Sequence, residues 1–120
     1  MTRLALAIAV LAAAPALAQD EPDATTLLCL DMKGPPEKLA EICPCVTETF
    51  QAEVDEEEAA LYEAVGARYL AKKSAGQGMV DAWDAAIAET AAEAGLGRTA
   101  LLSRMNDVGQ IHRAAMGSCM

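Results

Sequence analysis

Aromatic residues and strand-forming patterns are scarce in this sequence. Its 120 residues include one tryptophan, two tyrosines and one phenylalanine. No run of alternating β-branched residues is present of the kind that forms a half-buried strand, and no repeat of fixed period is visible. Alanine, leucine and glutamate are abundant instead, and all three are strong helix formers. The sequence therefore predicts an all-α protein.

Basic residues are also few. The chain has 9 Lys and Arg against 18 Asp and Glu, a net charge of −9. Phosphate backbones and anionic lipid surfaces repel a chain with this charge, so we expect no binding to nucleic acid.

The first residues have the pattern of a secretory signal peptide. Arg3 gives a positive start, an apolar run follows up to Pro15, and Ala16-Leu17-Ala18 is a small-x-small cleavage site. The run is too short to span a membrane, and no other apolar run is long enough to anchor the mature chain. We predict a signal peptide at 1–18, a flexible acidic tail at 19–24, a single helical domain at 25–120, and a periplasmic or secreted location.

The spacing of apolar residues predicts four to five helices joined by short loops. Apolar residues recur every three or four positions in segments at about 25–32, 36–54, 55–73, 79–94 and 99–117. Pro44 lies in the middle of the second segment, where it removes a backbone hydrogen bond. Either the helix kinks there, or it ends and a new helix begins with Pro44 in its first turn, which is the interpretation that we prefer. The pattern leaves open whether residues 44–73 form one helix or two.

Four cysteines lie in the predicted mature chain: Cys29, Cys43, Cys45 and Cys119. An even number of cysteines in an exported domain indicates disulfides. Helical residues at 43 and 45 would point roughly 200° apart, with Cys43 on the apolar stripe and Cys45 facing outward. Cys119 extends the apolar stripe of the last helix, so our first choice pairs Cys43 with Cys119 and Cys29 with Cys45. The swapped pairing, Cys29 with Cys43 and Cys45 with Cys119, stays open because Pro44 can disturb the helical register. In either case, we predict a small helical bundle cross-linked by two disulfides.

Two other chemistries compete for these cysteines. In the first, Cys43-Pro44-Cys45 is a thiol-disulfide redox site, although such motifs usually have two intervening residues. In the second, the cysteines and His112 bind a metal, although zinc ligands are usually spaced differently and export favours oxidation. We expect neither a metal nor a cofactor, and we interpret His112 as a residue at the edge of the apolar stripe.

Acidic residues are concentrated in one part of the chain. Between Glu37 and Glu63 there are nine acids and one basic residue, Lys38. Their simplest role is internal, with the more basic last helix lying beside them. The alternative is a patch that binds a basic protein. Its residues would be Glu53, Asp55, Glu56, Glu57 and Glu58.

The sequence shows no catalytic constellation, since its serines and carboxylates form no recognisable motif. We therefore expect a non-enzymatic binding module. The alternatives are a thiol-disulfide redox protein and an acid-stress chaperone that loses fixed packing at low pH. The sequence does not indicate the oligomeric state.

Overall fold

The computed structural model describes residues 22–120. The predicted signal peptide and residues 19–21 of the predicted tail lie outside this range. The described residues form five helices: α1 (Ala24–Leu30), α2 (Pro36–Glu53), α3 (Glu56–Ser74), α4 (Met79–Ala94) and α5 (Arg98–Ser118). The prediction of an all-α bundle with two disulfides is confirmed.

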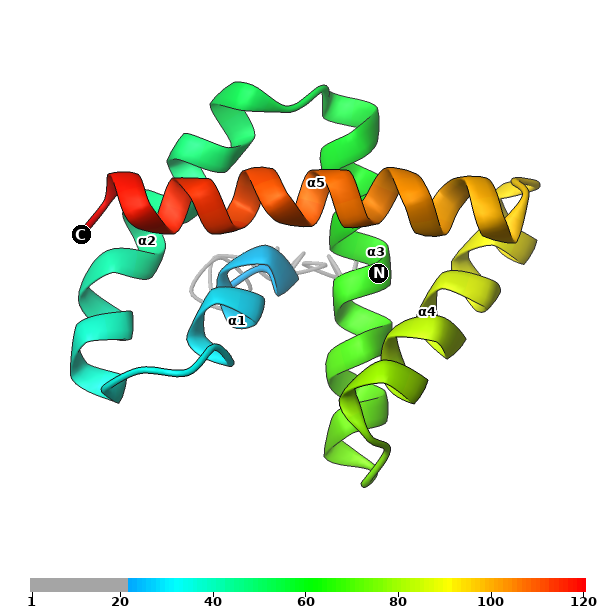
Figure 1. Ribbon diagram of the computed structural model, residues 1–120, viewed down its shortest axis with the longest axis horizontal. Coiled ribbons are helices and arrows are strands. Elements are labelled where there is room, and N and C mark those ends of the chain that lie inside the picture. The colour runs from blue at the N-terminus through cyan, green and yellow to red at the C-terminus, as the bar shows by residue number, and fades with distance from the viewer. Residues whose placement is uncertain (1–21) are drawn as a thin grey trace, which may run out of the picture.

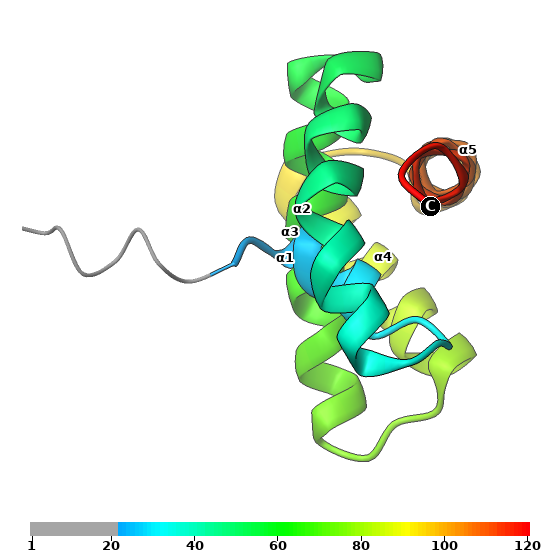
Figure 2. The same cartoon turned by 90° about the vertical axis from the view of Figure 1, so that its left-hand side faces the viewer.

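Helix α5 crosses one face of a layer formed by the other helices (Figure 1). Seen along its axis in Figure 2, α5 lies to one side of the column formed by α1, α2 and α3. Helices α3 and α4 form an antiparallel pair, and α1 fits between α2 and α3. The core between these layers is built from fully buried side chains on all five helices, among them Cys29, Phe50, Val65, Ile87 and Met105. The position of α5 therefore decides how much of this core is covered.

The helix ends follow the local sequence. Asp23 caps α1 by accepting a hydrogen bond from the Thr26 amide at 2.9 Å. Asp23 and Ala24, which the sequence places in the tail, thus belong to the start of α1. Gly95 ends α4 in the left-handed conformation, at φ 68°, where a glycine has no steric penalty. Asp55 is the N-cap residue of α3, but its side chain makes no capping hydrogen bond.

The preferred interpretation of Pro44, as the start of a new helix, is wrong. Helix α2 continues through it, and residues 44–73 lie in two helices that separate at Val54 and Asp55. Proline removes the amide that would bond to the carbonyl of Ala40. Both Ala40 and Pro44 are exposed, so water can reach that carbonyl. The helix consequently tolerates the proline and bends along its length (Figure 1).

Close contact between α1 and α3 depends on Gly66. A Cβ added there would lie 2.7 Å from Leu28 Cδ1 and 3.4 Å from Leu28 Cγ. We expect Gly66→Ala to lower the free energy of unfolding by about 1 kcal/mol, because the clash exceeds the gain in helix propensity. Gly109→Ala is the matched control, since its added Cβ would lie 3.9 Å from Tyr62 Cε1. It should stabilise the protein by up to about 1 kcal/mol. Urea unfolding measures both changes in the free energy of unfolding. Changes of the same sign in the two variants would contradict the close contact between α1 and α3.

Candidate functional site

The two disulfides connect α2 to the helices on either side of it. Cys29 in α1 is bonded to Cys43, with 5.8 Å between their Cα atoms. Cys45 is bonded to Cys119, the C-cap of α5, with a Cα–Cα distance of 6.0 Å. Cys29 and Cys43 are fully buried, whereas Cys45 is exposed and Cys119 is half-buried. One bridge is therefore internal and the other lies near the surface.

The first-choice pairing, Cys43 with Cys119 and Cys29 with Cys45, is wrong, and the structure has the swapped pairing instead. The buried and exposed sides of α2 were assigned correctly, because Cys43 points inward and Cys45 outward. The error concerns their partners. Helix α1 packs against the buried side of α2 and brings Cys29 into the core. The fully covered stripe of α5 ends at Ala115, so Cys119 is left near the surface within reach of Cys45.

The competing chemistries gain no support from this geometry. A redox site at Cys43-Pro44-Cys45 requires a bond between its two cysteines, and each is bonded to a different partner. Within residues 22–120, no group of three or more potential ligands is placed to hold a metal.

The acidic patch forms the corner where α2 passes into α3, seen at the top of Figure 1. We call Glu53, Asp55, Glu56, Glu57 and Glu58 the acidic corner. All are exposed except Glu58, which is half-buried. Arg104 of α5 pairs with Glu58 at 3.1 Å and with Glu57 at 3.7 Å. The expected internal pairing thus exists for two of the five acids, while Glu53, Asp55 and Glu56 have no ion-pair partner among the described residues.

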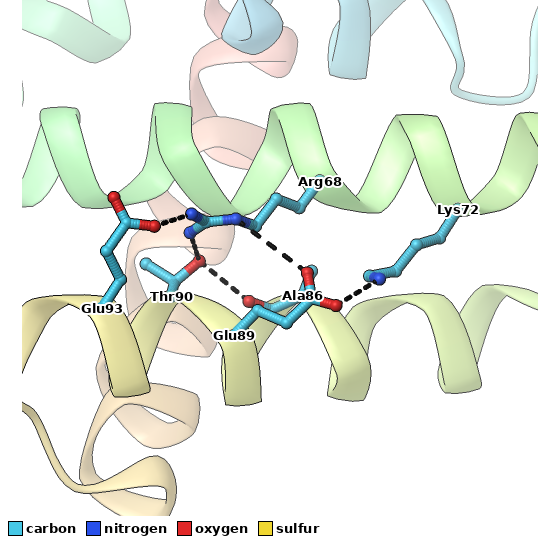
Figure 3. Close-up of polar contacts among 6 residues, drawn as sticks. All are labelled: Arg68, Lys72, Ala86, Glu89, Thr90 and Glu93. Atoms are coloured by element: carbon cyan, nitrogen blue, oxygen red, sulfur yellow. Dashed lines mark hydrogen bonds and ion pairs between the residues drawn. The ribbon is translucent and has the colours of Figure 1, made fainter.

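A second charged cluster fastens α3 to α4 (Figure 3). Arg68 reaches across to Glu93 and donates a 2.7 Å hydrogen bond to the Thr90 hydroxyl. That hydroxyl donates in turn to the carbonyl of Ala86, and Lys72 pairs with Glu89 at 2.7 Å. The charged groups of this cluster pair with one another across the two helices, so their role is to hold α3 against α4.

The N-terminus of α1 is held by Glu63 of α3. Its carboxylate accepts hydrogen bonds from the amides of Ala24 and Thr25, at 2.5 and 2.9 Å, and from the Thr25 hydroxyl. A hollow of about 280 Å³ adjoins this contact, with Asp23 and Phe50 among its walls. A carboxylate is favourable at the positive end of a helix, so Glu63 and Asp23 serve to anchor α1.

His112 is not at the edge of the apolar stripe. It is fully buried, and its Nδ1 lies 2.9 Å from the Tyr62 hydroxyl. Its Nε2 is buried without a hydrogen-bond partner among the described residues. Burial lowers the pKa of His112, while the carboxylate of Asp23 acts weakly in the opposite direction. Sequence reasoning missed this residue, although its register with Met105, Val108 and Ala115 on α5 was the available signal.

Trp83 packs against the rings of Tyr62 and Tyr69, with centroids 6.4 and 5.5 Å apart. It is only partly buried, and its indole donates a 3.2 Å hydrogen bond to Asn106. Packing therefore accounts for its position.

No family model, curated protein or solved structure matches this chain. Among residues 22–120, no helix combines the length and apolar character needed to span a membrane.

Proposed function

We propose that this protein is an exported, non-catalytic binding module whose acidic corner binds a basic protein. The observation that supports this proposal is the arrangement of charge at the junction of α2 and α3. Glu53, Asp55 and Glu56 are exposed, and none of them forms an ion pair with a Lys or Arg among the described residues. Complementary charge at such a surface favours encounter with a basic partner and determines its orientation.

The scaffold suits this role because the corner is fixed from two sides. Arg104 ties the first turn of α3 to α5 through Glu57 and Glu58. The Cys45–Cys119 disulfide ties the end of α5 back to α2. Groups held in place lose little conformational freedom on binding, which favours affinity.

The test compares two doubly neutralised variants that change the net charge equally. Glu53→Gln with Glu56→Gln alters the acidic corner. The control is Glu37→Gln with Asp81→Asn, which alters exposed acids at the starts of α2 and α4. Affinity for a lysine-rich peptide is measured by calorimetry at low and high salt. The corner variant should bind about fivefold more weakly than the wild type, and the control should change little. Equal losses in both variants would indicate that only net charge matters and would refute the proposal.

A second candidate, an acid-responsive chaperone, is favoured by one specific observation. The single histidine of the chain is fully buried at the interface of α5 with α2 and α3. The consequence of this position does not depend on the acidic corner.

A further inference from the structure

The ring of His112, on α5, packs between α2 and α3. Its ring packs edge-on against Phe50 of α2 and Tyr62 of α3, with centroid distances of 5.2 and 5.5 Å. Neighbouring turns of α5 bury Met105, Val108 and Ala115 along the same line. Any change that displaces this ring therefore disturbs the contact of α5 with both α2 and α3.

The pocket around His112 disfavours the protonated imidazolium. Tyr62 can satisfy Nδ1, but Nε2 has no partner within the described structure. The imidazolium carries a proton on both nitrogens. Among the described residues, Nε2 lacks a partner in either neutral tautomer, and protonation adds a buried positive charge whose Nε2–H has no acceptor, which disfavours the charged form.

Few charged groups in the surroundings can offset that charge. Burial raises the pKa of Tyr62 to about 12, so its phenol stays neutral. From the N-cap of α1, Asp23 favours the protonated histidine. On α5 itself, the positive charge of Arg113 lowers the pKa of Tyr62, against the larger effect of burial. Helix α2 contributes the apolar ring of Phe50.

We propose that His112 is a proton-operated switch: its protonation detaches the middle of α5 from α2 and α3 and exposes the apolar face of α5. The Cys45–Cys119 bridge keeps the end of the helix attached to α2 while it opens. The opened protein presents Met105, Val108 and Phe50, which are fully or almost fully buried in the closed form. This surface suits apolar segments of other proteins, the class of ligand that a chaperone binds.

The direction of the pH effect follows from the lowered pKa of His112. The closed state binds the proton more weakly than the open state, in which the histidine regains its ordinary pKa of about 6.5. Opening is therefore independent of pH well above 6.5 and increases as the pH falls below that value. The opening constant rises by at most about tenfold per pH unit, because one proton is taken up. It levels off below the pKa of the closed state.

The first experiment measures amide hydrogen exchange along α5 between pH 5 and 8, with both disulfides intact and with rates corrected for intrinsic exchange. Protection in the wild type should fall below pH 6.5 by up to about tenfold per unit. In His112→Met, protection should stay constant over the same range. Wild-type protection that does not change with pH would refute the switch. An equal fall of protection in His112→Met would also refute it, because carboxylates would then be responsible.

A second measurement uses the wild type alone and does not depend on the variant folding. The chain has a single histidine, so its ring gives one set of NMR resonances. The ring should titrate below its ordinary pKa, and the amides of α5 should shift with the same midpoint. A ring that titrates at about 6.5 while the α5 amides remain unchanged would refute the proposal. Binding of an apolar dye with that midpoint would show that the exposed surface is apolar.

Discussion

Phe50→Ala is expected to lower the free energy of unfolding by about 3–5 kcal/mol. The Phe50 ring is fully buried and contacts Tyr62 at a centroid distance of 5.1 Å and His112 at 5.2 Å. Removing it would leave a cavity between α2, α3 and α5 that neighbouring side chains can fill only in part. Urea unfolding followed by circular dichroism measures the loss, which is a large part of the stability of a small domain.

The matched control is Ile87→Val in α4, which is also fully buried but removes a single methylene. We expect it to cost about 1 kcal/mol. A Phe50→Ala variant that lost no more than this control would show that α5 does not rest on the Phe50 ring. Such a result would also weaken the account of His112, which shares that contact.

Removing the outer disulfide is the second change with a large expected effect. Cys45→Ala with Cys119→Ala opens a loop whose ends are 74 residues apart. In the chain-entropy model this lowers the free energy of unfolding by about 4 kcal/mol. Because Cys45 is exposed and Cys119 is half-buried, little packing is lost, and the unfolded chain accounts for most of the effect. Denaturant unfolding under oxidising conditions measures the difference.

The inner bridge supplies the comparison. Cys29→Ala with Cys43→Ala opens a shorter loop, with a separation of 14 residues, and loses about 3 kcal/mol by the same model. Both cysteines are fully buried, so lost packing adds to this value. A loss of less than about 1 kcal/mol on removal of the outer bridge would contradict this model. It would show that the bridge does not restrict the unfolded chain as the loop length requires.

Much of the fold was predictable because the helices carry regular apolar stripes. The boundaries predicted for α4 match the observed Met79–Ala94, since glycines flank this helix on both sides. Acids in the first turn of α3 and Lys72 and Lys73 in its last turn also match the helix dipole. These features depend on local sequence, which a single chain displays directly.

The errors arose where tertiary packing decides the outcome. Local sequence places Cys43 inward and Cys45 outward, but it does not reveal which helix lies against each side of α2. A proline inside a helix usually indicates an end, yet solvent access at Ala40 permits continuation at Pro44. Helical register places His112 in line with Met105, Val108 and Ala115 on α5, but its full burial is decided by α2 and α3, which pack around it. In each case, the deciding contact comes from a residue distant in sequence or from solvent.

Disulfide mapping is the direct test of whether one buried and one surface bridge connect α1 and α5 to α2. Trypsin leaves Cys43 and Cys45 together in the peptide from Leu39 to Arg68. Digestion alone therefore does not distinguish the observed pairing from the pairing of Cys43 with Cys119 and Cys29 with Cys45. Mild reduction of the folded protein, followed by alkylation, digestion and fragmentation, assigns each cysteine. The account predicts that Cys45 and Cys119 are labelled first, with Cys29 and Cys43 still joined. Early labelling of Cys43 together with Cys119, or a bond between Cys43 and Cys45, would contradict it.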